Sequence, residues 1–343
     1  MSVFFIAEAG VNHNGDLDRA LEMVDVAAAA GADAIKFQTF TAEKLASPRA
    51  EKAEYQKRET GEGDQFAMLK ALEMDEAAHR ALIARCAEQG IEFMSTPFDE
   101  DAADMLIALG MRRIKVPSGE LINHPLLRYL ARFDRSMILS TGMATLAEIE
   151  EALAVVADTR TQSGFAAPMA TMVTVLHCTS NYPADPADVN LRAMRTIADA
   201  TNMPIGYSDH TLGLAVSTAA VALGATIIEK HFTLDRALPG PDHRASLTPA
   251  ELVAQIAQIR AVSIALGSTE KAPTAAELAV RAVARRSVAA TRALLAGTVL
   301  AAGDMILLRP ASGIPPKHLD ELPGRRLRNA IPAGGAIAWD DLV

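Results

Sequence analysis

Short apolar runs alternate with helix-like stretches over most of the chain. The runs are rich in Ile, Val, Phe and Met, as are the buried strands of a parallel sheet. They lie at residues 4–8, 34–38, 91–95, 113–116, 137–140, 172–176, 203–206 and 225–229. Eight strands that alternate with helices through right-handed crossovers predict an α/β fold, the closed (β/α)8 TIM barrel. An open doubly wound sheet is the alternative, although no Gly-x-Gly-x-x-Gly motif follows any of the runs.

The helix-like stretches carry recognisable boundaries. Residues 20–30 and 76–89 have the pattern of helices, and each stretch is followed by a glycine. Glycine ends a helix well because it adopts the left-handed backbone without strain at Cβ. Thr145 and Glu148 have the spacing of a capping box, which predicts a helix that begins after Thr145.

The pattern changes near the end of the chain and predicts a second domain. We expect the barrel over residues 1–268, a linker with a helix over 269–286, and a small β-rich domain over 287–343. In the last segment, glycines and prolines separate short apolar pairs, as in a chain of short strands and turns. A domain of about 60 residues has a marginal core unless it contacts a partner surface.

Composition and charge exclude several classes of protein. The chain has 343 residues, of which 50% are hydrophobic and 22% charged, and no apolar run reaches the length of about 18 residues that a membrane helix needs. The apolar start at residues 3–7 is too short for a signal peptide, and Cys86 and Cys178 lack metal-type spacing, so we expect a cytoplasmic protein with buried thiols. A net charge of −9 argues against a nucleic-acid surface.

Two histidines follow the last two apolar runs. His210 and His231 should therefore lie at the carboxyl ends of neighbouring strands, close to Asp209, Glu229 and Lys230. Two imidazoles that converge in this way are suited to a divalent metal in a pocket for an anionic substrate. The alternative is that both are ordinary polar residues at strand ends.

Two lysines in strand-like runs indicate an anion site. Lys36 and Gln38 are two residues apart in an extended segment, so both should face the barrel interior. Lys115 lies in a later run, and Ser and Thr hydroxyls follow several of the others. Lysines with short hydroxyl donors suit phosphate and carboxylate groups. The alternative is a structural ion pair with Glu8 or Glu120.

Three acids and one further histidine complete the candidates. Glu8 and Glu120, at strand ends, could bind a hydroxyl, orient a water or exchange a proton. Asp242 lies in a stiff loop after the last strand, where it could close the pocket or belong to a plain turn. His13 is interpreted as a turn residue rather than a ligand.

Short motifs at the predicted strand ends extend this pattern along the whole chain. They are Ile6–Gly15, Lys36–Gln38, Ser95–Phe98, Lys115–Glu120, Ser140–Met143, His177–Pro183, Gly206–His210, Glu229–Phe232 and Pro239–Asp242. In this order they resemble the sialic acid synthases, the bacterial N-acetylneuraminate type of nonulosonate synthase. Residues 284–343 resemble the antifreeze-like SAF domain, a β-clip fold that ends those enzymes.

The resemblance implies a transferase that condenses phosphoenolpyruvate with an N-acylmannosamine-type sugar and releases phosphate. Carbon 3 of phosphoenolpyruvate would attack C1 of the open-chain sugar, and water would add at C2. His210 and His231 would bind a divalent metal, Mn²⁺ first and Mg²⁺ or Co²⁺ otherwise, with Glu8 and Glu120 as catalytic acids or bases. Phosphoenolpyruvate would be held by Lys36, Thr96, Lys115, Ser118, Ser140, Ser180, Asn181 and Ser208, with either Ser180 or Asn181 facing the phosphate. The sugar would contact Gln38, Tyr182, Asp242 and Arg309.

The resemblance also implies a homodimer in which the SAF domain completes the partner's site. Arg309 matches the family's arginine, but Arg309-Pro310-Ala311 replaces the frequent Arg-Pro-Gly, so Arg326 and Arg328 stay open as alternatives. The acceptor is expected to be N-acetylmannosamine, with the 2,4-diacetamido-2,4,6-trideoxy sugar that leads to legionaminic acid as the alternative. An octulosonate-phosphate type synthase and a sugar- or ice-binding module are the remaining hypotheses. The former needs a further basic cluster, and the latter does not account for lysines inside a barrel.

Overall fold

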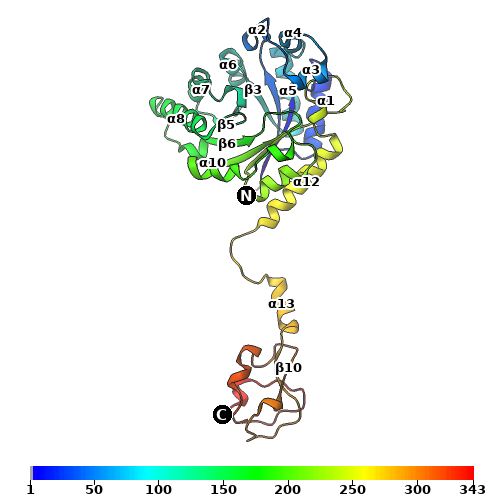
Figure 1. The fold of residues 1–343 in the computed structure, drawn as a ribbon, viewed down its shortest axis with the longest axis vertical. Helices are drawn as coiled ribbons and strands as arrows, with labels where there is room; N and C mark the ends of the chain where they lie inside the picture. The colour runs from blue at the N-terminus through cyan, green and yellow to red at the C-terminus, as the bar shows by residue number, and fades with distance from the viewer. Residues whose placement is uncertain (1–2) are drawn as a thin grey trace. The chain divides into compact units, whose positions relative to one another are not determined.

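The computed structural model describes residues 3–343 of the chain (Figure 1). The chain separates into two compact units, Met1–Gly267 and Ser268–Val343, and each is described by itself. None of the described helices is long and apolar enough to cross a membrane.

Eight strands form the sheet of the first unit, in the order β3-β2-β1-β8-β7-β6-β5-β4. All the paired strands run parallel, and β3 also packs beside β4, which closes the cylinder. The strands are β1 (Phe4–Gly10), β2 (Ala34–Thr39), β3 (Glu92–Pro97), β4 (Arg113–Val116), β5 (Ser136–Ser140), β6 (Val173–Cys178), β7 (Ile205–Asp209) and β8 (Ile227–His231). The predicted (β/α)8 barrel is confirmed.

Helices surround this cylinder (Figure 1). They are α1 (Leu17–Ala29), α5 (Glu76–Gln89), α6 (Glu100–Ala108), α7 (His124–Ala131), α8 (Leu146–Gln162), α9 (Met169–Met172), α10 (Ala193–Thr201), α11 (Ala215–Ala222) and α12 (Pro249–Leu266). The predicted capping box begins α8, where Thr145 and Glu148 cap each other's backbone. At the carboxyl end of α5, Gly90 has φ +70°, which lies in the left-handed region that favours glycine.

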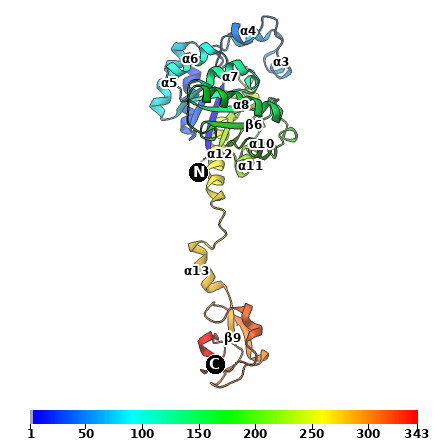
Figure 2. The same cartoon turned by 90° about the vertical axis from the view of Figure 1, so that its left-hand side faces the viewer.

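A segment of three short helices follows β2 and was not predicted. It contains α2 (Ala42–Leu45), α3 (Glu54–Thr60) and α4 (Gln65–Lys70). Figure 2 shows α3 and α4 beyond one end of the sheet. Because the segment leaves the carboxyl end of β2, it lies on the side of the barrel where the strands end.

The barrel has one apolar core outside the sheet and another inside it. The outer core fills the space between strands and helices, with Phe5, Phe37 and Tyr207 among its largest buried side chains. The inner core is smaller and consists of Ile6, Ala34, Met94, Ile138, Leu176 and Ile227. Side chains alternate between the two faces of each strand, which accounts for the two separate cores.

The second unit has a small core of its own. It begins with α13 (Ala275–Ala284) and contains an antiparallel pair of strands, β9 (Ser287–Ala290) and β10 (Met305–Leu308). Three 3-10 helices complete it, η4 (Ala302–Asp304), η5 (Pro316–Glu321) and η6 (Trp339–Asp341). Val288, Leu294, Leu300, Ile314, Leu322 and Ile337 are among its buried core residues. The predicted β-rich, turn-rich character of this segment is confirmed.

Candidate active site

A cavity of about 360 Å³ lies at the carboxyl ends of the barrel strands. Most of the residues that we predicted from the sequence line it together. They are Glu8, Lys36, Gln38, Thr96, Lys115, Ser118, Ser140, Ser180, Tyr182, Ser208, His210 and His231. Side chains from all eight strands or from the loops that follow them therefore meet in one place.

The alternation along each strand explains why these side chains converge. On β1, Ile6 belongs to the inner core, and Glu8, two residues later, lines the cavity. The same change occurs from Ala34 to Lys36 and from Ile227 to Glu229. The inner faces of these three strands thus change from apolar to polar at one level inside the barrel.

Lys36 is the centre of a buried charge network at this level. Its Nζ lies 2.8 Å from Glu8 Oε2 and 3.7 Å from Glu229 Oε2, and it donates a hydrogen bond to Thr96 Oγ1 at 3.0 Å. The side chain is only 4% exposed, so its charge depends on these partners. Lys36 therefore forms the ion pair with Glu8 that was the alternative interpretation, and it also lines the cavity as predicted.

Glu229 joins the second lysine to the first. Lys115 Nζ lies 3.6 Å from Glu229 Oε1, and the Ser208 hydroxyl donates to the same oxygen at 3.0 Å. Although burial acts to raise the pKa of Glu229, the charges of Lys115 and Lys36 lower it to about 2. Glu229 therefore stays ionised and holds both ammonium groups at the cavity wall.

Glu8 is in a different electrostatic state from Glu229. Burial raises the pKa of Glu8 to about 7, although the charge of Lys36 opposes this shift. A carboxyl group with this pKa can exchange a proton near neutral pH. When Glu8 is protonated, the two lysines and Glu229 leave one net positive charge, which favours an anion in the cavity.

The two predicted histidines face each other at the same end of the barrel. Their ring centroids are 5.5 Å apart, and the ring of Tyr182 lies 4.2 Å from that of His210 and 5.6 Å from that of His231. His210 Nδ1 lies 2.7 Å from the Thr179 carbonyl oxygen, to which it can only donate, so its lone pair is on Nε2. Burial lowers the pKa of both imidazoles, that of His231 most strongly. Both are therefore neutral, which is the form that binds metals.

Further observations support a ligand or cation next to these rings. Within the described residues, His231 Nδ1 and Ser140 Oγ are buried polar atoms without a hydrogen-bond partner. No group of three or more His, Cys, Asp and Glu side chains in residues 3–343 is arranged to hold a metal by itself. Two imidazoles are thus the nitrogen ligands that this cavity offers to a cation, fewer than the three side chains of a typical catalytic zinc site.

Three predicted site residues of the barrel lie outside the cavity lining. Ser180, not Asn181, is the residue of that loop that lines the cavity. Glu120 is the last residue of η1 (Ser118–Glu120) and accepts a hydrogen bond from Asn123 Nδ2 at 2.6 Å. Asp242 precedes η3 (His243–Ala245) and is buried, and Arg309 belongs to the second unit, where it is exposed.

The positions of Asp209 and Lys230 differ from our expectation. We expected them beside the histidines, but they lie on the outer face of the sheet, where Lys230 Nζ is 2.6 Å from Asp209 Oδ2. The period of two places them there, because each directly precedes a histidine that faces inward. His13 is a buried turn residue, as predicted, and its Nδ1 accepts from the backbone N–H of Gly15.

Two polar residues of the cavity wall were given no role in the site from the sequence. Glu229 was expected close to the histidines, and its spacing of two from His231 places both on the inner face. Cys178 was interpreted only as a buried thiol. In the structure its Sγ lies 3.1 Å from Ser118 Oγ at the cavity wall. A thiol gives no sequence signal for such a position.

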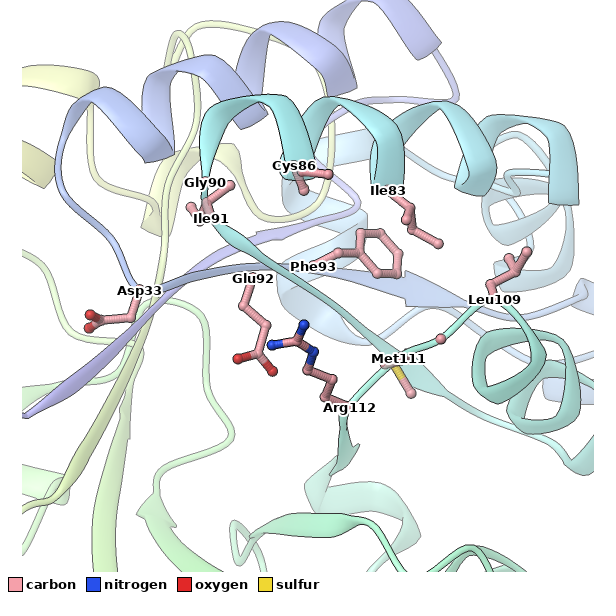
Figure 3. Close-up of a pocket in the computed structure, with 12 residues that line it drawn as sticks. Asp33, Ile83, Cys86, Gly90, Ile91, Glu92, Phe93, Leu109, Met111 and Arg112 are labelled. Carbon is pink, nitrogen blue, oxygen red and sulfur yellow. The ribbon is translucent and has the colours of Figure 1, made fainter.

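A separate cavity of about 440 Å³ lies at the amino ends of the strands (Figure 3). It is lined mainly by apolar side chains, such as Ile83, Phe93 and Met111, together with Asp33 and Glu92. It contains none of the predicted site residues. In barrels of this kind the chemistry is at the opposite end, so the smaller polar cavity is the candidate active site.

Burial of Asp242 leads to a prediction for stability. Since burial raises the pKa of Asp242 from 3.8 to about 6, the folded chain binds this proton more tightly than the unfolded chain. The free energy of unfolding should therefore decrease as the pH rises from about 4 to about 6, by at most about 3 kcal/mol. Asp242→Asn lacks this decrease and should be more stable than wild type at neutral pH. Urea unfolding of both chains across this pH range measures the difference, and a pH-independent difference would contradict the prediction.

Family models match both units of the chain. The NeuB family matches residues 23–271, and the SAF domain matches residues 285–343. The chain belongs to the NeuB family. The NeuB-family chain is 48% identical over 343 residues to an N,N'-diacetyllegionaminic acid synthase of Legionella pneumophila, with 100% of this chain and 95% of that protein covered.

Other relatives of the NeuB-family chain agree. A synthase of the same name from Campylobacter jejuni is 44% identical, with 93% of this chain and 94% of that protein covered. The crystal structure of the N-acetylneuraminic acid synthetase of Leptospira borgpetersenii, in complex with citrate, has a TM-score of 0.71 at 35% identity and covers 82% of this chain and 90% of that chain. The predicted family, the predicted SAF domain and the prediction of a synthase are confirmed.

Proposed function

We propose that this chain is an N,N'-diacetyllegionaminic acid synthase, which condenses phosphoenolpyruvate with 2,4-diacetamido-2,4,6-trideoxymannose and releases phosphate. The observation that carries the proposal is the convergence of two buried lysines, a ring of hydroxyls and two neutral histidines on one cavity. The choice of acceptor is supported by the two relatives that bear this name. N-acetylneuraminate synthesis is the second candidate, favoured by the likeness to the Leptospira enzyme.

The lysine layer would hold phosphoenolpyruvate. Lys36 and Lys115 carry the charge that a phosphate and a carboxylate need, and Glu229 keeps both ammonium groups in place. The hydroxyls of the cavity wall would donate to the remaining oxygens, from Thr96, Ser118, Ser140, Ser180 and Ser208. Fixed donors around the phosphate would stabilise the charge that develops when it departs.

The histidine pair would hold a divalent cation, which we propose to be Mn²⁺. A bound cation of this kind polarises a carbonyl oxygen and orients the two reactants. The neutral rings of His210 and His231 and the unpartnered Nδ1 of His231 support this role. Tyr182, whose ring packs against both imidazoles, would contact the sugar together with Gln38.

Glu8 would act as the general base that takes the proton of the attacking water. Carbon 3 of phosphoenolpyruvate would form a bond to C1 of the open-chain sugar, whose aldehyde oxygen takes up a proton. Water would add at C2, and the bond from C2 to the phosphate oxygen would break, which releases inorganic phosphate. Glu8 lies at the cavity wall with a pKa of about 7, so its carboxylate can take the proton of that water near neutral pH. We assign Glu120 to a sugar hydroxyl, since η1 directly follows the cavity residue Pro117.

We further propose that the SAF unit of a second copy completes the site through Arg309. The barrel cavity contains lysines as its cationic side chains but no arginine among the described residues that line it. Arg309→Ala should raise the KM for the acceptor about 10- to 100-fold, the loss of one charged contact of about 1.5–3 kcal/mol, with little change in the KM for phosphoenolpyruvate. Arg326→Ala is the matched control, because the Arg326 guanidinium donates to the Gly297 carbonyl within its own unit. Equal effects of both substitutions would reject the assignment.

Phosphate release tests the proposed function. The purified chain is incubated with phosphoenolpyruvate, Mn²⁺ and either acceptor, and inorganic phosphate and the mass of the product are measured. We expect kcat/KM to be about 10-fold or more higher with the diacetamido sugar than with N-acetylmannosamine, because substituents at two sugar carbons differ. A preference for N-acetylmannosamine would support the second candidate, and no release with either sugar would reject both.

A further inference from the structure

A buried ion pair lies directly behind the two histidines. Asp209 and Lys230 are register partners on β7 and β8, and each directly precedes one of the histidines in the chain. Their side chains are fully buried, and Lys230 Nζ lies 2.6 Å from Asp209 Oδ2. The pair thus joins the ends of the two strands on the outer face, while His210 and His231 face the cavity on the inner side.

The same pair also fixes the loop after His210. Asp209 Oδ1 accepts hydrogen bonds from the backbone N–H of Thr211 at 2.9 Å and from its hydroxyl at 2.7 Å. Lys230 Nζ donates to the Thr211 carbonyl oxygen at 2.9 Å, and the Ser217 hydroxyl of α11 donates to Asp209 Oδ2. The backbone is therefore held on both sides of His210, by one network that also contains the residue before His231.

Stability alone does not account for this arrangement. Burying two charges costs about as much as their attraction returns, so an apolar pair of similar volume is often as stable. The Asp209–Lys230 pair, however, is directional and joins two strands at the point where their histidines must converge. Its geometry restricts the separation of the two rings, which is 5.5 Å between centroids.

We propose that Asp209 and Lys230 are positioning residues that set the separation of His210 and His231 and thereby the affinity of the site for a divalent cation. This inference rests on the proposed cation role of the two histidines. Residues that orient metal ligands without touching the metal typically change metal affinity by about 10- to 100-fold when replaced. Neither residue lines the cavity, so their replacement should act through the rings.

The test measures Mn²⁺ binding to the full chain without substrates, from the electron paramagnetic resonance signal of free Mn²⁺. The variant is Asp209→Asn/Lys230→Met, which removes both charges and keeps similar side-chain volumes. We expect its dissociation constant for Mn²⁺ to rise about 10-fold or more, with little change in phosphoenolpyruvate affinity measured by calorimetry. Arg160→Met is the matched control, because Arg160 is a 3% exposed cation paired with Asp134 on the outside of the barrel. It should lower the melting temperature without changing Mn²⁺ affinity.

His210→Ala, measured in the same way, distinguishes the positioning role of Asp209 and Lys230 from the cation role of the histidines. If His210→Ala loses Mn²⁺ binding and the double variant binds like wild type, the positioning role is overturned and the cation role stands. If wild type and His210→Ala bind Mn²⁺ equally, both are overturned. Should the double variant not fold, Lys230→Met removes the ion pair while Asp209 keeps its donors from Thr211 and Ser217, and an Mn²⁺ dissociation constant equal to that of wild type would overturn the proposal.

Discussion

Replacement of His210 with alanine should lower metal-dependent turnover about 1,000-fold. The proposed cation is expected to lower the barrier by about 4 kcal/mol through polarisation and orientation, and each 1.4 kcal/mol or so corresponds to a factor of about ten. The fold should survive, because the His210 ring makes its hydrogen bond to the Thr179 carbonyl of a neighbouring loop and takes no part in the apolar cores.

Turnover at saturating phosphoenolpyruvate and Mn²⁺ measures this effect, and circular dichroism checks the fold. His177→Gln is the matched control, since His177 lies on the outer face of β6, where its ring packs against Tyr207 and lies 2.6 Å from the Val189 carbonyl. It should retain most of the turnover. Wild-type turnover in His210→Ala would show that this imidazole holds no essential cation.

Lys36→Met should reduce kcat/KM for phosphoenolpyruvate about 100- to 1,000-fold, as removal of one preorganised donor to a developing negative charge does in other enzymes. Lys36 contacts Glu8 and Thr96 and stands next to Glu229, so its loss also leaves two carboxyl groups without their common cation. Steady-state phosphate release over a range of phosphoenolpyruvate concentrations measures the change.

Two further variants identify the cause. Lys44→Met, at a lysine of α2 that is 44% exposed, is the control for loss of a positive charge at this end of the barrel and should behave like wild type. Glu8→Gln/Lys36→Met removes the repulsion between carboxylates as well. Because Glu8 is itself assigned to proton transfer, the phosphoenolpyruvate affinity of this double variant is measured by calorimetry. If the lysine acts by binding phosphate, the affinity stays low; recovery of wild-type affinity would instead assign Lys36 to charge compensation.

The barrel could be predicted because its strands are short apolar runs that alternate with helix-like stretches along the sequence. Lys36 and Gln38 were placed on the inner face from their spacing of two, and both line the cavity. The same spacing applied to β8 gives Glu229 and His231 on the inner face and Lys230 on the outer face. The signal for Glu229 was therefore present in the sequence.

Other features depend on contacts that no local pattern contains. Ser180 and Asn181 are adjacent in an irregular loop, where side chains do not alternate between faces, so only the packing of that loop places Ser180 at the cavity. The pKa of Glu229 is low because its carboxyl faces two lysines, whereas the pKa of Glu8 is raised because its carboxyl faces mainly one. These differences arise from distances between strands that are far apart in the chain.

An apolar layer fills the barrel interior beneath the lysines, so the cavity above it has an apolar floor. Ile6, Met94, Leu176 and Ile227 form this layer, and the cavity lies above them at the strand ends. A ligand held at the lysine level must then enter before any ligand that sits nearer the entrance, and its remnant must leave after that neighbour has moved. If the lysine level holds phosphoenolpyruvate as we propose, the inorganic phosphate released there would leave past the sugar product or after it.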